Sequence, residues 1–422
     1  MPKPYVTILG KAIRTAARMR GGGSALPGLV VERIDPDFIK DTLATLPRGV
    51  VVISGTNGKT TTTKMVVELL ESQGLRVFTN KTGSNFTRGV AAALLGEIDM
   101  KGVLDADIAV LELDEAHAVH FVRTIAPRYC LMLNVMRDQL DRFGEIDTTA
   151  NLLRTVTQAT SEIVILNRED QRIAELKDTL DAQSVRFFGL SDDLIATFPS
   201  DDTLHGSAVR LNNYKADVIL TSFTGNQATF IIDGRAVTTP LKLTGIYNVY
   251  NAAAALALVR AIMGDLINHD KLITALANVT PAFGRGETII VNGKPLELVL
   301  VKNPSGFRLG LQSFPPAGYA TMIAINDNYA DGRDMSWLWD VSFESLRSEG
   351  VALISGIRAY DMTLRLQYDE VPIASVEPHL KKALKQFLAE NAETPKRIYC
   401  TYTAMLAIRR DIATLTKVEA IG

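Results

Sequence analysis

The sequence contains few of the residues that mark extracellular, zinc-binding or membrane-spanning proteins. Among 422 residues there are only two cysteines, Cys130 and Cys400, which lie far apart and each within an apolar run. Two such cysteines form neither a disulfide framework nor a CxxC metal site, so we expect a reducing, cytoplasmic environment. No stretch approaches the roughly 20 uninterrupted apolar residues of a membrane-spanning helix, and the first residues lack a signal-peptide cleavage pattern.

The chain also lacks a strong net charge. Its 45 lysines and arginines against 47 acidic residues give a formal charge of -2, which offers no electrostatic argument for nucleic acid as a partner. Basic side chains do gather at the start, where Lys3, Lys11, Arg14, Arg18 and Arg20 surround a short apolar face. Because that face is short, we expect a helix packed on the first domain, with at most peripheral contact with an anionic membrane as the alternative.

The chain is too long for one hydrophobic core, so two or three domains are expected. From about residue 48, continuous apolar runs such as "GVVVISG" alternate with helical patterns, which predicts a parallel sheet with crossover helices. Residues 190–240 turn to short strands in a small antiparallel excursion. We therefore predict an α/β protein with a packed N-terminal segment over 1–47, a central domain over 48–295 and a C-terminal α/β domain over 296–422.

The stretch "SGTNGKTTT", between the first predicted strand and a helix, suits phosphate binding. It is shorter than the usual Walker A loop and consists of Gly55, Thr56, Asn57, Gly58, Lys59, Thr60 and Thr61. Glycines let backbone N–H groups approach phosphate oxygens, and the start of the helix adds positive potential. Lys59 would reach the terminal phosphates of ATP and the Thr60 hydroxyl would ligate Mg²⁺. A glycine turn without a ligand is the alternative.

Acidic and amide side chains follow two further apolar strands. The strand "VLELDEA" ends in Glu112, Asp114 and Glu115. We expect Glu112 to hold Mg²⁺, directly or through water, and Glu115 to be part of a solvated turn. A second cluster past the next strand consists of Asn134, Asp138, Gln139, Asp141 and Arg142. Such a cluster is also typical of a capped helix start. Two clusters at neighbouring strand ends favour a binding site, because ligands of open α/β sheets bind at the carboxyl ends of the strands.

The order of these motifs resembles the Mur ligase superfamily, ATP-dependent enzymes that phosphorylate a carboxylate and then form an amide. The motifs are "SGTNGKTTT", "LELDE", "LNVMRDQLDRFGEID", "ILNRED", "LTGIYNVYNAAAA" and "FGRGE". The later stretches "VKNPSGF", "NDNYADGRDMSW", "SGIRAYDMTLRL" and "YTAML", with "ALPGLVV" near residue 26, extend the resemblance to the MurT branch over essentially the whole chain. It implies a Mur ligase-like fold with a central ATP-binding domain.

The chain departs at one point from the superfamily and at another from its MurT relatives. Amino-acid-adding Mur ligases carry a histidine where this chain has Gln139, and a downstream lysine that becomes carbamylated. No lysine occurs between Asn151 and Ser161, so a second metal of the usual kind is not expected. Many MurT relatives also insert a four-cysteine zinc ribbon, whereas residues 190–240 contain no cysteine, and we expect no zinc.

The resemblance also implies residues for nucleotide binding. Asn248 and Asn251 match the asparagine-containing helix start of the family, and Arg285 in "FGRGE" matches a phosphate-facing arginine. A helix cap is the alternative role for Asn248; the two roles are compatible, and we favour nucleotide binding. Lys302 and Asn303 would contact the transferred phosphate. The alternative is that the turn they belong to has only a structural role.

The loop "INDNYADGRDMSWLWD" carries Asp327, Asp331, Asp334 and Asp340. From composition alone, it reads equally well as a solvated loop. The resemblance implies a partner, a GatD-like glutaminase that brings a cysteine and a histidine, with the carboxylate that orients the histidine supplied by this chain. Asp334 is our first choice for this role and Asp340 the second. Neither cysteine of the chain has a histidine nearby in sequence, so ammonia must come from elsewhere.

The resemblance thus implies Mg²⁺-dependent phosphorylation by ATP of the α-carboxyl of D-glutamate in the lipid II stem peptide. Ammonia from the glutaminase would then displace phosphate and leave D-isoglutamine. We expect a cytoplasmic protein that acts at the inner face of the plasma membrane. The alternatives are a stand-alone Mur or folylpolyglutamate-type ligase that adds an amino acid, and a non-catalytic ATP-binding scaffold.

Overall fold

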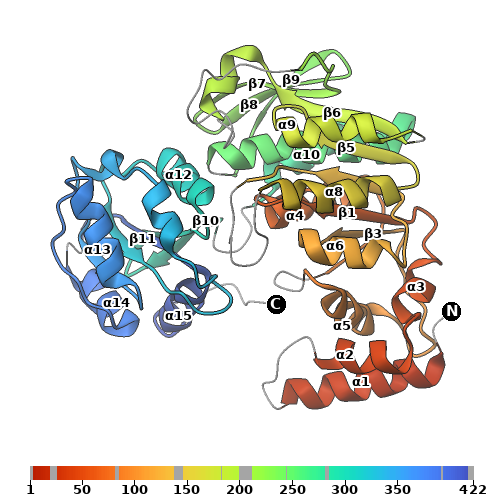
Figure 1. The fold of residues 1–422 in the computed structure, drawn as a ribbon, viewed down its shortest axis with the longest axis horizontal. Coiled ribbons are helices and arrows are strands. Elements are labelled where there is room, and N and C mark those ends of the chain that lie inside the picture. Colours follow the sequence, from red (N-terminus) through yellow and green to blue (C-terminus); the bar gives the residue numbers. More distant parts are fainter. Residues whose placement is uncertain are drawn as a thin grey trace.

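The computed structural model describes residues 3–19, 26–80, 85–136, 146–181, 183–198, 212–243, 245–280, 285–390 and 393–416. Within these ranges, strands form one sheet of nine strands and one of five, each covered by helices on both faces. The two sheets belong to two bodies that lie side by side, with a group of N-terminal helices at the far edge of the larger body (Figure 1).

The N-terminal helices are α1 (Pro4–Met19), α2 (Leu26–Ile34) and α3 (Phe38–Leu43). One face of α1 packs on α2 and on α5 (Thr87–Glu97). Gly10 permits this close packing, since a Cβ there would lie 2.7 Å from Val31 and 2.6 Å from Leu95. The segment therefore packs on the larger body through α1, α2 and α3, each of which contacts α5.

The larger sheet has the order β2-β3-β1-β4-β5-β6-β7-β8-β9. Its strands are β1 (Val50–Ser54), β2 (Val77–Thr79), β3 (Ile108–Glu112), β4 (Tyr129–Met132), β5 (Ile163–Asn167), β6 (Ser184–Leu190), β7 (Val218–Thr224), β8 (Gln227–Ile232) and β9 (Arg235–Pro240). All pairs from β2 to β7 are parallel, and β7 to β9 are antiparallel. The predicted α/β class is confirmed, and the antiparallel strands extend the same sheet; residues 199–211 lie outside the described residues.

Helices cover both faces of this sheet because its central strands are buried on both sides. One face carries α4 (Lys59–Ser72), α10 (Ile246–Met263) and α11 (His269–Asn278). The other carries α5, α6 (Glu115–Val122), α8 (Ile146–Ala159) and α9 (Gln171–Ala174). The stretch Ile246–Leu266 is long and apolar enough to cross a membrane, but most of it is buried here as a core helix.

The smaller sheet has the order β10-β11-β14-β12-β13, and only the β10–β11 pair is antiparallel. Its strands are β10 (Arg285–Val291), β11 (Lys294–Leu300), β12 (Ala320–Ala324), β13 (Leu353–Ser355) and β14 (Lys396–Cys400). The helices α12 (Pro304–Ser313) and α13 (Ala359–Tyr368) cover one face. The other face carries α14 (Leu380–Ala389) and α15 (Tyr402–Ile412).

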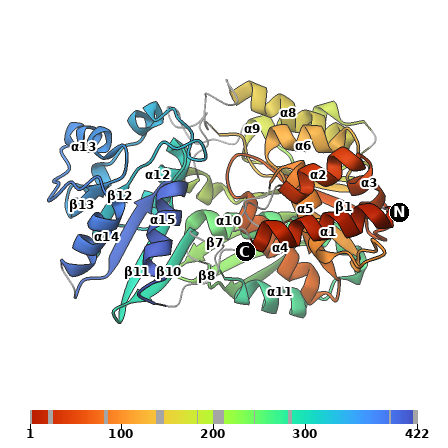
Figure 2. The same ribbon diagram turned by 90° about the horizontal axis from the view of Figure 1, so that it is seen from below.

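The predicted domain boundary at residues 295 and 296 falls inside the β10–β11 hairpin. The hairpin turns at Asn292 (φ 51°) and Gly293 (φ 78°), a pair that favours tight two-residue turns between antiparallel strands. Because β10 pairs with β11, the C-terminal sheet begins at Arg285, before the predicted boundary. In the view from below, α12 of this body lies beside α10 of the larger one, and the two helices are in contact (Figure 2).

Candidate active site

The phosphate loop connects β1 to α4 at the carboxyl edge of the larger sheet. Gly55 has a φ of 130°, and a Cβ there would lie 2.9 Å from the backbone nitrogen and oxygen of Asn134. Gly58 has a φ of 89°, and a Cβ there would lie 2.7 Å from Oδ1 of Asn251. Both positions therefore require glycine, for backbone conformation as well as for space.

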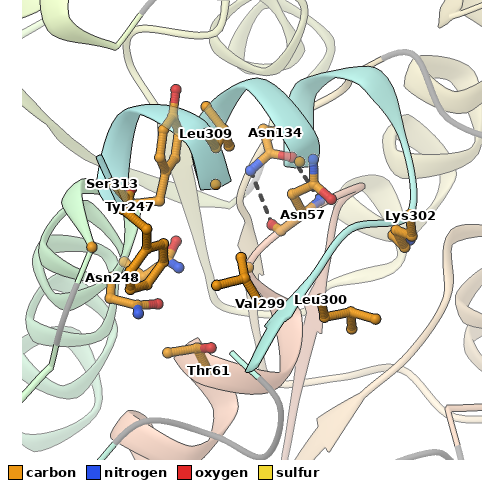
Figure 3. A pocket seen from close by; sticks show the side chains of 16 residues that line it. Asn57, Thr61, Asn134, Tyr247, Asn248, Val299, Leu300, Lys302, Leu309 and Ser313 are labelled. Atoms are coloured by element: carbon orange, nitrogen blue, oxygen red, sulfur yellow. Dashed lines mark hydrogen bonds between the residues drawn. The ribbon is translucent and has the colours of Figure 1, made fainter. Parts of the chain in front are cut away.

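Asn134, which follows β4, holds this loop in place. Its Nδ2 donates a hydrogen bond to the carbonyl of Asn57 over 3.0 Å, and its Oδ1 accepts one from the Asn57 N–H over 2.9 Å (Figure 3). Its own carbonyl accepts from the Thr56 N–H over 3.0 Å. Asn134 thus belongs to the loop's support; the neighbouring candidates Asp138, Gln139, Asp141 and Arg142 lie outside the described residues.

Lys59 begins α4 and is buried beneath the loop, with 6% of its surface exposed. Its Nζ donates to the carbonyls of Gly55 and Thr56 and lies 3.7 Å from Oε2 of Glu115. The expectation of a solvated Glu115 is wrong: this side chain is 4% exposed, because the start of α6 directs it inward toward Lys59. Burial raises the pKa of Glu115, and the positive charges of Lys59 and Lys302 oppose that rise.

The two predicted Mg²⁺ ligands lie together. The Thr60 hydroxyl donates to Oε1 of Glu112 over 2.8 Å, and both side chains are buried. Glu112 is fixed in turn by Asn80, which accepts from its N–H over 2.9 Å and donates to its carbonyl over 2.8 Å. A hydroxyl beside a carboxylate suits Mg²⁺, which prefers oxygen ligands. Sequence reasoning missed Asn80, whose only signal was its place after β2, the strand next to β3.

A pocket lies between the two bodies. The larger body lines it with the phosphate loop and with Asn248 and Asn251 at the start of α10. The smaller body lines it with the end of β11, with α12, and with Lys302 between them. Figure 3 shows Tyr247 and Asn248 at one end of the pocket and Lys302 at the other. The structure thus brings the predicted Asn248, Asn251 and loop residues together around one space. The Arg285 side chain lies outside the described residues.

Asn303 links the two bodies at this pocket. Its Nδ2 donates to Oδ1 of Asn57 over 3.1 Å, while its own Oδ1 accepts from the Gly306 N–H over 2.7 Å and so caps α12. The residue is fully buried. A second link joins the Ile246 N–H to the Ser313 hydroxyl over 3.2 Å. Asn303 therefore positions the phosphate loop as well as its own turn.

Two of the four acids in the loop after β12 are engaged in internal contacts. Asp327 forms an ion pair with Arg358 over 2.8 Å. Asp331 is 1% exposed and accepts from the N–H of Thr403 over 2.7 Å and from its hydroxyl over 2.5 Å. Burial raises the pKa of Asp331. These two residues stabilise the loop.

The other two acids lie nearer the surface. Asp334 is half-buried, and its carboxylate accepts from the Ser336 N–H over 2.9 Å. Hydrogen bonds from Ser336 hold the pKa of Asp334 below its usual value, so the side chain is a carboxylate at neutral pH. Asp340 is exposed, and its carbonyl accepts from Arg308 over 2.6 Å. Neither Asp334 nor Asp340 lines the pocket between the bodies.

A row of exposed apolar side chains lies beside this loop. Tyr360, Leu364 and Tyr368 follow one another at every fourth position of α13 and are 70%, 49% and 70% exposed. Trp339, in the acidic loop, is 48% exposed and packs edge-on against Tyr368 with 5.0 Å between ring centroids. We call Trp339, Tyr360, Leu364 and Tyr368 the aromatic stripe. Sequence reasoning missed it, because the same spacing is typical of a helix face that packs in a core.

Solved structures share this arrangement of bodies. The chain is similar to a pseudomurein peptide ligase type C from Methanothermus fervidus, with a TM-score of 0.69 and 18% identity over 90% of this chain and 81% of that one. It is also similar to a MurF ligase from Thermotoga maritima in complex with ADP, with a TM-score of 0.68 and 17% identity over 90% and 83%. The chain therefore has the fold of these Mur-type peptide ligases, with its phosphate loop at the pocket.

Comparison with protein families narrows this class. Residues 53–259 match the Mur ligase middle domain, and residues 300–405 match the MurT ligase C-terminal domain. The chain is 31% identical to the lipid II isoglutaminyl synthase (glutamine-hydrolyzing) subunit MurT of Streptococcus pneumoniae, over 96% of both chains. It is 28% identical to the Staphylococcus aureus subunit of the same name, over 86% of this chain and 87% of that one. The chain belongs to the MurT family.

Proposed function

We propose that this protein uses ATP and Mg²⁺ to amidate the α-carboxyl of D-glutamate in the lipid II stem peptide, with ammonia supplied by a GatD-like glutaminase. The observation that carries this proposal is the phosphate loop, with buried Lys59 and the Thr60–Glu112 pair, beside a pocket that both bodies line. The relatives from S. pneumoniae and S. aureus are named as subunits of a glutamine-hydrolysing lipid II synthase. We place the reaction at the cytoplasmic face of the plasma membrane, because ATP and a lipid-anchored acceptor meet there.

The proposed reaction proceeds in two steps, phosphorylation and amide formation. A carboxylate oxygen of the acceptor attacks the terminal phosphorus of ATP and ADP leaves, which gives an acyl phosphate. Ammonia then attacks the acyl carbon, loses a proton, and phosphate leaves with the former carboxylate oxygen. The first step is needed because a carboxylate oxygen is a poor leaving group. Once it carries the phosphoryl group, it leaves as part of phosphate, which is a good leaving group.

The residues of the pocket suit these steps. Lys59 and the backbone N–H groups of the phosphate loop would hold the phosphates of ATP. Asn248 lies at the opposite end of the pocket from Lys302, where it would hold the adenosine. Asn251, which lines the same pocket and lies against Gly58, would contact the nucleotide beside the loop. Lys302 would then face the transferred phosphate. Thr60 and Glu112 would hold Mg²⁺, which when bound neutralises charge on the phosphate oxygens.

The source of ammonia lies outside this chain. Both cysteines are buried in strands. Burial raises the pKa of Cys130 to about 12 and raises that of Cys400 as well, so neither thiol forms the thiolate that a glutaminase needs. In our proposal, a partner therefore supplies the nucleophile.

Asp334 would complete the catalytic triad of that partner, with Asp340 as the second choice. Its ionised carboxylate suits a residue that orients a histidine and stabilises the imidazolium. The adjacent aromatic stripe would dock the glutaminase, since exposed tyrosine and tryptophan clusters are typical of protein interfaces.

Release of ADP in the presence of an acceptor stem peptide tests this function against its alternatives. Our proposal predicts that the chain alone releases ADP and forms amide with ammonium chloride, and uses glutamine only after the glutaminase is added. A stand-alone amino-acid ligase would respond to free amino acids and ignore ammonium. A non-catalytic scaffold would bind ATP and release no acceptor-dependent ADP under any of these conditions.

A further inference from the structure

Glu115 is a buried carboxylate beside the phosphate loop to which the proposed reaction gives no role. It lies in the first turn of α6, and its Oε2 lies 3.7 Å from Nζ of Lys59. Withdrawing a carboxylate from water is unfavourable unless nearby positive charges compensate for the loss of hydration. The burial of Glu115 therefore directs attention to the positive charges around it.

Lys59 supplies the first of these charges. An ammonium group has three N–H donors, and Lys59 donates to the carbonyls of Gly55 and Thr56. Its separation of 3.7 Å from Glu115 is too long for a hydrogen bond but short enough for an ion pair. Glu115 therefore acts on Lys59 through its charge, so a third N–H can be directed at a phosphate oxygen.

Lys302 supplies the second charge, and it comes from the smaller body. Its neighbour Asn303 donates to Oδ1 of Asn57 over 3.1 Å, which fixes this turn against the phosphate loop. Lys302 itself lines the pocket that the loop lines (Figure 3). Burial raises the pKa of Glu115, and the positive charges of Lys59 and Lys302 oppose that rise. One carboxylate is thus attracted to a lysine from each body.

The two lysines would repel each other without this carboxylate. Like charges in a partly buried site interact unfavourably, because little water and salt screen them. The packing of the two bodies brings Lys302 toward the phosphate loop and Lys59, and it therefore needs a negative charge beside both. Glu115 provides that charge from the larger body.

We propose that Glu115 is a positioning residue, which holds Lys59 and Lys302 together at the phosphate loop and so joins the smaller body to the larger one. The assignment of the transferred phosphate to these lysines rests on the proposed function. The electrostatic link between the two bodies does not, since it depends only on the three side chains. Glu115 would act through the lysines and would contact neither the nucleotide nor the acceptor.

Hydrogen–deuterium exchange of the full chain at the start of α12 tests this link without any nucleotide. Glu115→Gln keeps the size of the side chain and removes its charge, so the lysines repel each other. We expect exchange at residues 305–310 to become at least about threefold faster. Adding Lys302→Gln removes the repulsion and should restore the original exchange. Glu68→Gln is the matched control, because Glu68 pairs with Lys64 over 3.8 Å on α4 but is partly exposed.

Kinetics separate this role from a merely structural one. In the ammonium-driven reaction, Glu115→Gln should lower kcat by at least about tenfold, because a displaced lysine no longer meets the transferred phosphate. Its affinity for ATP, measured by calorimetry, should not fall, since Lys59 keeps its charge and loses a competing carboxylate. Glu115→Asp, which keeps the charge, should recover part of kcat.

Unchanged exchange in Glu115→Gln, or no recovery in the double variant, would overturn the inference. So would weaker ATP binding with an unchanged kcat, which would show that Glu115 only shapes the phosphate loop. If the unmodified chain forms no amide with ammonium, the proposed function fails. The exchange result still decides in that case whether Glu115 joins the two bodies.

Discussion

The phosphate-loop pocket and the acidic loop differ in how much of their chemistry lies within this chain. Beside the pocket, Lys59, Glu112 and Glu115 are buried around the phosphate loop, and hydrogen bonds or ion pairs join them to other groups of the chain. At the acidic loop, Asp334 is half-buried and the aromatic stripe beside it is exposed. Buried, paired charges indicate a site that this chain assembles by itself. Exposed aromatic side chains beside a carboxylate indicate a site that a partner protein completes. Mutations should therefore separate the two regions.

Lys59→Ala should have the largest effect, with loss of both ammonium-driven and glutamine-driven amidation. The reason is that no other side chain of the loop carries a positive charge to the phosphates. Lys64→Ala, on the same helix but partly exposed, is the matched control and should keep its activity. Product formation is measured with a stem-peptide acceptor, and complex formation with the glutaminase should be unchanged in both variants. Amidation at the normal rate by Lys59→Ala would remove the phosphate-loop assignment.

Asp334→Asn should reduce glutamine hydrolysis in the complex by about 10⁴-fold while ammonium-driven amidation persists. The substitution keeps the size of the side chain but removes the charge that holds the histidine tautomer, and losses of this order follow in other triads. Glutamate release reports the first activity and amide formation the second. If Asp334→Asn and Asp340→Asn both keep full hydrolysis, the partner supplies its own third residue. Loss of ammonium-driven activity would instead place this loop in the ligase site.

Replacing Tyr360 and Tyr368 by alanine should weaken the complex with the glutaminase by roughly 30-fold or more, as truncation of central interface aromatics does. The effect on ammonium-driven amidation by the chain alone should be nil, because neither residue lines the pocket. Affinity is measured by titration calorimetry. An unchanged dissociation constant would show that the partner docks on another surface.

Glu112→Ala should lower ammonium-driven amidation by at least about 10- to 100-fold, since losing even an outer group that only orients a metal ligand costs that much. The rate should recover partly as Mg²⁺ is raised, because the Thr60 hydroxyl remains. The measurement is the rate against Mg²⁺ concentration, with ATP affinity determined alongside. A residual rate that never responds to Mg²⁺, with normal nucleotide affinity, would contradict the metal role.

Adding a zinc chelator should have the smallest effect: we expect no change in the melting temperature. A structural zinc site contributes directly to folding stability, so removing the metal would lower the melting temperature noticeably. Elemental analysis of the purified protein should likewise find no stoichiometric zinc. One zinc per chain would show that a site without cysteine ligands was missed within residues 190–240.

The sequence predicted the features that follow from local pattern. Continuous apolar runs indicated parallel strands, and the carboxyl ends of parallel strands meet at one edge, so the grouping of Glu112 and Asn134 around the loop could be foreseen. The start of α10 was identified by the resemblance, and the structure places Asn248 and Asn251 beside the same loop. The roles of these residues in binding and catalysis stay predictions.

Features that depend on tertiary packing could not be foreseen in the same way. Glu115 lies one position into α6, and its direction depends on where Lys59 lies in space. The contact of Asn303 with Asn57 depends on how the two bodies meet, which no local pattern encodes. The predicted boundary at residues 295 and 296 falls within a hairpin, because the Asn292–Gly293 turn was not recognised as one that joins β10 to the second sheet.

The central claim is that this chain by itself activates a carboxylate as an acyl phosphate. The most direct test is oxygen transfer from a stem-peptide acceptor whose D-glutamate α-carboxyl carries ¹⁸O at both positions, with ATP, Mg²⁺ and ammonium chloride. Our account predicts one ¹⁸O in each inorganic phosphate released, and one left in the amide carbonyl, without any glutaminase present. Phosphate free of ¹⁸O, or ¹⁸O found in AMP, would contradict it.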